Sequence, residues 1–187
     1  MVVDFINYIQ SECKRNKIRL SLAPVKYIYV DGDVCFGSFD KSTRSLNVSI
    51  KNDSWIEVLA HEFGHVQQFL EDSDLIGSDF DDAAGVFGDH LAGKTIEPGL
   101  LLESAQKVVL CEIDAEIRAL GYLTSFGISE GLPYIEQANA YIFGHAYAVQ
   151  HGRWQKAKTV PTGLYKEQIC RDPFGEMTDL IMNHLFF

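Results

Sequence analysis

The residues best suited to chemistry stand at positions 61 to 65, which read His-Glu-Phe-Gly-His. On an α-helix, two histidines four residues apart are separated by about 40° around the axis and about 6 Å along it. Both imidazoles can therefore reach one tetrahedral metal ion, and Glu62 between them is placed to take a proton from the metal's water. The spacing of His61 and His65 thus predicts a metal site with a general base.

The helix that carries these residues has two sides suited to burial. On one side, apolar residues form a stripe at helical spacing: Ile56, Leu59, Phe63, Val66 and Leu70. His61 and His65 lie roughly opposite this stripe and are flanked by Val58 and Phe69. An exposed polar face that happens to contain two histidines is the alternative, and the flanking apolar residues argue against it. We therefore expect both histidines to face the interior.

Two histidines leave a catalytic zinc ion one protein ligand short. The longest helical pattern, residues 100–126, offers three carboxylates, those of Glu112, Asp114 and Glu116. Glu112 and Glu116 project from the middle of the apolar side of this helix, whereas Asp114 points toward solvent with Arg118. Glu112 is therefore the expected third ligand.

The two carboxylates on the buried side need partners, because an unpaired buried carboxylate is costly. A metal bound by Glu112, with Glu116 accepting the other ring N–H of a ligating histidine, satisfies both side chains. A salt bridge to Arg or Lys elsewhere in the core is the alternative. That alternative would leave the two histidines without a third ligand.

These residues resemble the gluzincins, the thermolysin-like zinc metallopeptidases, in which H-E-x-x-H is followed on a later helix by E-x-x-x-D/E. The resemblance covers about residues 34–154 and includes a sheet-then-helix order similar to that of the smallest single-domain members. It implies that His61, His65 and Glu112 bind Zn²⁺ and that Glu62 is the general base. It also implies that Glu116 is the acid behind a histidine ligand, although the family commonly has Asp there.

Residues 138–141 (Ala-Asn-Ala-Tyr), with Arg153-Trp after them, are also similar to uncharacterised phage and bacterial proteins that carry H-E-x-x-H. In gluzincins an edge strand pairs with the extended substrate backbone, and the resemblance assigns this role to residues 34–39. An ordinary structural hairpin is the equal alternative for this segment.

A third helix, over residues 133–150, is the expected source of a donor to the transition state. One of its faces aligns five residues: Tyr134, Ala138, Tyr141, His145 and Ala148. Tyr141 is the first candidate to donate a hydrogen bond to the tetrahedral oxyanion, and His145 is the second. A core aromatic and a satisfied buried histidine are the alternatives.

The remaining elements position these residues. A helix is expected over residues 2–16, and a small antiparallel β-meander over residues 18–50, with hairpin turns near Gly32 and Ser42. Ser54 and Glu57 have the spacing of a capping box, which predicts a helix over residues 55–71.

Two further segments have weaker patterns. Residues 72–99, rich in Asp and Gly, are expected to form a long surface loop that is solvated and is not a calcium site. Residues 174–185 form a short amphipathic segment near the end of the sequence.

Composition sets the class of the protein. The 187 residues carry a formal net charge of -10, which disfavours nucleic acid and anionic membrane surfaces as partners. The four cysteines form no C-x-x-C pair, so reduced thiols in a cytoplasm, of a bacterium or an infected host cell, are expected. No apolar stretch is long enough to span a membrane. We expect one α+β domain over residues 1–187, with the small antiparallel β-meander packed against a mainly helical zincin-like part.

The function expected from these residues is zinc-dependent hydrolysis of a peptide bond in a peptide or protein substrate, with Glu62 as the general base. Two alternatives stay open. One is a zinc-binding interaction module without turnover, whose metal would be closed to water. The other is a hydrolase of a non-peptide amide, which the sequence does not separate from a peptidase.

Overall fold

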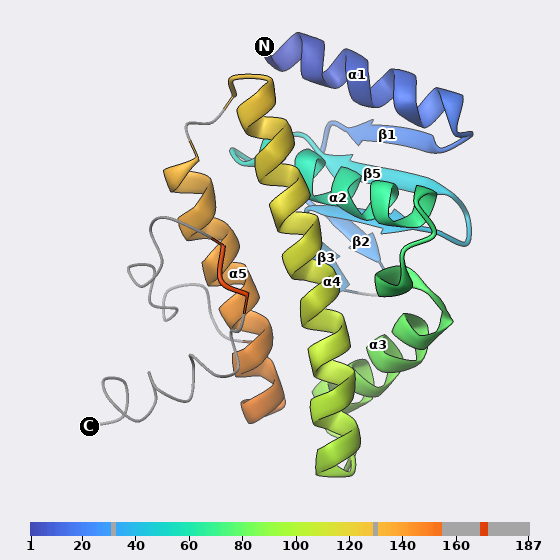
Figure 1. Ribbon diagram of the computed structural model, residues 1–187, viewed down its shortest axis with the longest axis vertical. Coiled ribbons are helices and arrows are strands. Elements are labelled where there is room, and N and C mark those ends of the chain that lie inside the picture. Colours follow the sequence, from blue (N-terminus) through green and yellow to red (C-terminus); the bar gives the residue numbers. More distant parts are fainter. Residues whose placement is uncertain (31–32, 129–130, 155–168, 172–187) are drawn as a thin grey trace. The chain divides into compact units, whose positions relative to one another are not determined.

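The computed structural model describes residues 1–30, 33–128, 131–154 and 169–171 (Figure 1). Five α-helices and five short strands among these residues confirm the expected α+β class. The chain packs as two compact units. The first contains residues 1–73 and 114–131, and the second contains residues 74–113 together with the described part of 132–187.

Three helices contribute to the first unit. They are α1 (Val2–Arg15), α2 (Trp55–Leu70) and the C-terminal part of α4 (Pro98–Ser125), and they confirm the helices predicted near these positions. The predicted capping box at the start of α2 is wrong. Ser54 stands at the N-cap, but its φ of -100° and ψ of 22° lie outside the extended region that a capping side chain needs, and it makes no capping hydrogen bond.

The five strands of the first unit form two separate sheets. The strands are β1 (Arg19–Ala23), β2 (Ile28–Val30), β3 (Asp33–Cys35), β4 (Gly37–Asp40) and β5 (Ser45–Ser49). One sheet has the order β1-β5-β4, and β2 and β3 form the other, antiparallel sheet. Residues 31–32, which include the turn expected at Gly32, lie outside the described residues.

One strand pairing differs from the predicted meander. β4 and β5 are antiparallel and flank the turn expected near Ser42, but β1 pairs with β5 in the parallel direction, so that Leu20 lies opposite Leu46. Alternation of apolar and polar residues indicates that a strand exists, but it does not show with which other strand it pairs. Every residue of β5 except Asn47 is buried, in keeping with a strand paired on both edges.

An aromatic cluster ties the helices of the first unit together. Its members are Phe5, Tyr8, Phe63, Tyr122 and Phe126. The ring centroids of Phe63 on α2 and Tyr122 on α4 are 5.2 Å apart, and those of Phe5 on α1 and Phe126 beyond α4 are 5.3 Å apart. Phe5 and Phe63 are completely buried, and each contributes roughly 1.5–3 kcal/mol by leaving water.

A glycine permits the closest approach between α2 and α4. A Cβ atom added to Gly64 would lie 2.8 Å from the carbonyl oxygen of Ala115 and 3.0 Å from its Cα. Both of these neighbours are backbone atoms, so they cannot turn aside as a flexible side chain would. Gly64, between the two histidines at 61 and 65, therefore fixes how near these histidines come to α4.

The second unit contains a helix that the sequence analysis missed. Residues 72–99, expected as a surface loop, instead contain the 3-10 turn η1 (Asp74–Ile76) and the helix α3 (Ser78–Leu91). Its apolar side chains repeat at helical spacing: Phe80, Ala83, Ala84, Phe87 and Leu91. They pack with Val108 of α4 and Ala148 of α5 (Leu132–His151), the helix predicted over 133–150. The frequent Asp and Gly residues hid this periodicity.

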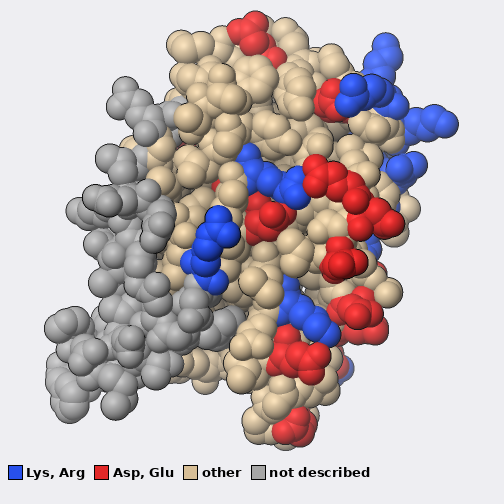
Figure 2. Space-filling model, in the orientation of Figure 1, with Lys and Arg blue, Asp and Glu red and all other residues tan. Residues whose placement is uncertain are grey.

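The charged side chains lie mainly on the surface. On the face drawn in Figure 2, acidic and basic groups lie side by side. Lys107 and Glu103 form an exposed pair of this kind, and their charged atoms are 3.0 Å apart. None of the described helices has both the length and the apolar character needed to cross a membrane. All four cysteines lie in the described residues, and no disulfide bond joins any of them. The segment expected at 174–185 lies outside the described residues.

Replacing Gly64 by Ala is expected to destabilise the protein by about 1–3 kcal/mol, because the added methyl group collides with the backbone of α4. Gly121→Ala is the matched control, since this α4 glycine has open space where a Cβ would stand. The control should be neutral or stabilising by up to about 1 kcal/mol. Equilibrium unfolding in denaturant measures both, and equal stabilities would refute the close contact.

Candidate metal centre

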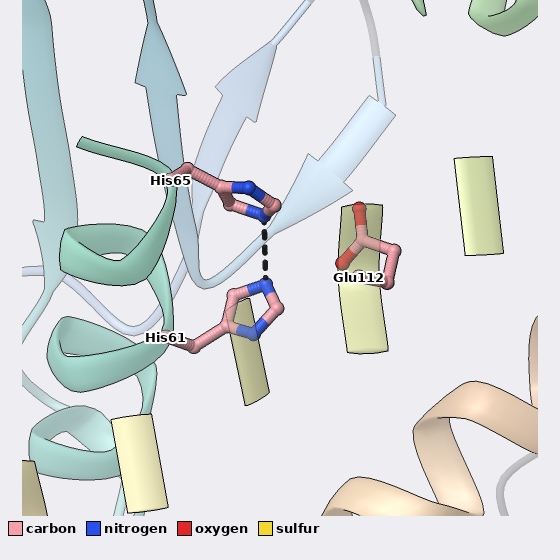
Figure 3. Close-up of side chains that lie close together, drawn as sticks. All are labelled: His61, His65 and Glu112. Atoms are coloured by element: carbon pink, nitrogen blue, oxygen red, sulfur yellow. Dashed lines mark hydrogen bonds between the residues drawn. The ribbon is translucent and has the colours of Figure 1, made fainter. Parts of the chain in front are cut away.

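Three predicted ligands lie together in the structure. His61, His65 and Glu112 each offer one ligand atom, and these atoms all lie within 4.8 Å of one another (Figure 3). The histidines come from α2 and the carboxylate comes from α4. Because α4 is one continuous helix, Glu112 stands one turn before Glu116, which packs in the first unit. The group is therefore close enough to hold a metal ion.

Both histidine rings have their Nδ1 atoms directed at an oxygen. Nδ1 of His61 lies 3.1 Å from Oε1 of the buried Glu116, the position expected for that carboxylate. Nδ1 of His65 lies 2.8 Å from Oε1 of Gln68. An oxygen acceptor beside Nδ1 favours the ring proton on that atom in both histidines. The Nε2 atom of each ring then carries a lone pair.

The two Nε2 atoms face each other at a distance of 3.2 Å, as the dashed line in Figure 3 shows. Two lone pairs this close repel unless a proton or a metal cation stands between the rings. Tetrahedral zinc with Zn–N bonds of about 2.0–2.1 Å separates two nitrogen ligands by roughly 3.3 Å. Two imidazoles and a carboxylate are also a donor set that suits zinc and related transition metals. The residues therefore fit such an ion.

Asp114 is connected to this centre, which corrects the expectation that it only faces solvent. Nε2 of Gln68 donates to Oδ2 of Asp114 at 2.9 Å, and Nε of Arg118 donates to the same oxygen at 2.6 Å. Gln68 in turn contacts His65, so Asp114 lies two hydrogen bonds from a candidate ligand. Gln68 was not among the predicted site residues, although it lies three residues after His65 on one helix, a spacing that brings two side chains together.

Glu62 lies against the first residue of β4. A Cβ atom added to Gly37 would lie 2.7 Å from Cγ and 2.9 Å from Oε1 of Glu62. Glycine at this position therefore leaves the space that the Glu62 side chain occupies. Residues 34–39, expected as one edge strand, divide between β3 and β4, and only β4 belongs to the three-stranded sheet.

Tyr141 and His145 lie together on α5 in the second unit. Their ring centroids are 4.7 Å apart, and Nδ1 of His145 lies 3.1 Å from the backbone oxygen of Tyr141, to which it donates. His145 is 4% exposed and its ring contacts Phe87 and Trp154, whereas Tyr141 is 44% exposed. These contacts define the surroundings of both residues within their own unit, and their role in a reaction stays a prediction.

Glu112→Gln is expected to weaken metal binding by more than roughly 100-fold, the upper range for residues that only support a ligand. The amide keeps the size of the side chain but removes the negative charge that a divalent ion prefers. Glu103→Gln on the same helix is the control, because Glu103 is exposed and pairs with Lys107. Titration with Zn²⁺ against a competing chelator measures both, and equal affinities would exclude Glu112 as a ligand.

Comparisons with known proteins found no relative of this chain. No family model, no curated protein and no solved structure matches the chain. The candidate centre therefore rests on the residue types and on their geometry in this structure.

Proposed function

We propose that the protein is a zinc-dependent metallopeptidase that hydrolyses a peptide bond in a peptide or protein substrate. The proposal rests on one observation, the convergence of His61, His65 and Glu112 within 4.8 Å. Two histidines and one glutamate form a three-ligand set, which is typical of catalytic zinc sites that keep a position for water. Structural zinc sites use four protein ligands, so three ligands favour catalysis over a closed interaction module.

A bound zinc ion would supply Lewis-acid chemistry, by polarising a carbonyl group and lowering the pKa of a water molecule. Glu62 is the proposed general base, because it stands between the two histidine ligands on α2. It accepts the proton of the attacking water and returns it to the amine nitrogen as the C–N bond breaks. Gly37 supports this role by leaving room for the Glu62 side chain beside β4.

We place the substrate backbone along β4. This strand is an outer strand of its sheet, paired with β5 on one side, and its first residue lies against Glu62. An extended peptide that adds to such an edge forms main-chain hydrogen bonds that do not depend on its sequence. Pairing of this kind would bring a scissile bond next to the proposed general base.

Tyr141 remains the first candidate donor to the oxyanion, and His145 the second. The partial exposure of Tyr141 suits a phenol that must meet a substrate, whereas His145 is enclosed and uses Nδ1 to donate to a backbone oxygen. A single donor of this kind accelerates turnover by about 10²- to 10³-fold.

Glu62→Gln should keep zinc and the fold but lower the rate of cleavage by about 10²- to 10⁴-fold, because the amide cannot accept the proton. The measurement is cleavage of a broad peptide library, read by mass spectrometry, together with zinc content. Glu57→Gln, on the same helix but outside the histidine motif, is the control and should cleave normally.

The outcomes of this experiment separate the alternatives. A Gln variant at position 62 that cleaves like the wild type would show that Glu62 is structural. Bound zinc without cleavage of any peptide would reject the peptidase and favour an interaction module or a hydrolase of another amide. A purified protein that takes up no transition metal would end the zinc proposal.

Tyr141→Phe should leave the melting temperature almost unchanged and lower turnover by about 10²- to 10³-fold, because only the hydroxyl group is removed. Tyr147→Phe on the same helix is the matched control, and His145→Asn is measured beside it. Normal turnover of the Tyr141 variant beside a folded, inactive His145 variant would transfer the role to His145. Full activity of both variants would remove α5 from the mechanism.

A further inference from the structure

A chain of polar side chains leads from His65 to the end of α2. His65 contacts Gln68, Gln68 contacts Asp114, and Asp114 contacts Arg118. Arg118 then donates from Nη1 and Nη2 to the two carboxylate oxygens of Glu71, at 3.0 Å and 2.9 Å. All five residues belong to the first unit, three on or next to α2 and two on α4.

The hydrogen bonds between these side chains have one possible direction. The Arg118 guanidinium only donates, so Oδ2 of Asp114 is an acceptor and the Gln68 atom facing it is the amide nitrogen. The amide oxygen of Gln68 must then face His65, where it accepts from Nδ1–H. A single arrangement of donors and acceptors thus directs the lone pair on Nε2 of His65 toward the metal position.

Burial and charge strengthen this arrangement. Gln68 is completely buried, and a buried amide is kept where its donors and acceptors have partners. The hydrogen bonds that Arg118 donates to Glu71, and after them the one to Asp114, raise the pKa of the Arg118 guanidinium above its ordinary value. Arg118 is therefore a charged donor in this arrangement.

We propose that Gln68 and Asp114 are positioning residues that hold His65 in the tautomer and orientation needed to bind the metal ion. The inference rests on the zinc site proposed above and deepens it. The two histidines are then held differently. His61 faces the carboxylate of Glu116 directly, whereas His65 faces a neutral amide whose orientation is set by a more distant carboxylate.

The direction of the hydrogen bonds from Arg118 to His65 can be tested by exchanging the amide at position 68 with the carboxylate at position 114. Gln68→Glu alone places a second carboxylate against Asp114, and Asp114→Asn alone removes the negative charge that attracts the Gln68 amide nitrogen and the Arg118 guanidinium. In the double variant Gln68→Glu/Asp114→Asn, the new carboxylate at position 68 accepts from His65. The new amide at position 114 can turn to donate from its nitrogen to that carboxylate and to accept from Arg118 at its oxygen, so each group again has a partner.

Two measurements on the full chain report on the metal position. One is Zn²⁺ affinity by competition with a chelator, and the other is the visible absorption spectrum of the Co²⁺-loaded protein, which depends on ligand geometry. Gln68→Ala and each single exchange should weaken Zn²⁺ binding by about 10- to 100-fold. The double variant should recover most of that loss and regain the wild-type Co²⁺ spectrum.

Gln67→Ala is the matched control for Gln68→Ala. It removes the same side chain from the neighbouring position of α2, where Nε2 is buried but has no hydrogen-bond partner among the described residues. This variant should bind Zn²⁺ as the wild type does. Circular dichroism and the melting temperature verify that each variant is folded. If Gln68→Ala fails to fold, the comparison of Asp114→Asn with the double variant decides the question.

The results that overturn the inference differ from those that overturn the function. Wild-type affinity and spectrum in Gln68→Ala, beside loss of metal in His65→Ala, would reject the positioning role and leave the metal site standing. A double variant no better than either single variant would also reject it. A wild-type protein that binds neither Zn²⁺ nor Co²⁺ would reject the metal site, and the positioning role with it.

Discussion

The close approach of α2 and α4 at Gly64 is the constraint on which the site depends. Gly64 lies between His61 and His65 in the H-E-x-x-H motif. The residue that it contacts on α4, Ala115, is next to Glu116. A larger residue at 64 would separate the helices at that level. The aromatic cluster around Phe63 also holds these two helices together, through the contact of Phe63 with Tyr122 on α4.

The histidine pair is organised by what lies behind it. Glu116 faces the Nδ1 atom of one ring and Gln68 faces that of the other, so both Nε2 atoms are turned toward each other. Two facing lone pairs repel, so this arrangement favours a proton or a metal cation between the two rings. Burying the carboxylate of Glu116 costs free energy, and the same carboxylate orients the ring of His61.

The proposed general base also contacts a third element of the structure. Glu62 lies on the same helix as the histidines but contacts the start of β4, where Gly37 leaves it room. β4 and α2 are therefore in contact at Glu62, the residue proposed to transfer the proton. Such a boundary suits a reaction on an extended backbone, since an outer strand can align a peptide beside a carboxylate. The aromatic surroundings of His145 belong to the second unit and are organised separately.

The sequence by itself determined the helices of the site and the directions of their side chains, because periodicity records which residues share a face. That is why Glu112 and Glu116 could be assigned to the apolar side of α4. Only the tertiary structure decided that Gln68 meets Asp114, since a helical wheel describes one helix and contains nothing about its neighbour. The parallel partner of β1 was undetermined for the same reason. The helix at residues 78–91 was not predicted because its many Asp and Gly residues are typical of loops, although its apolar residues repeat at helical spacing.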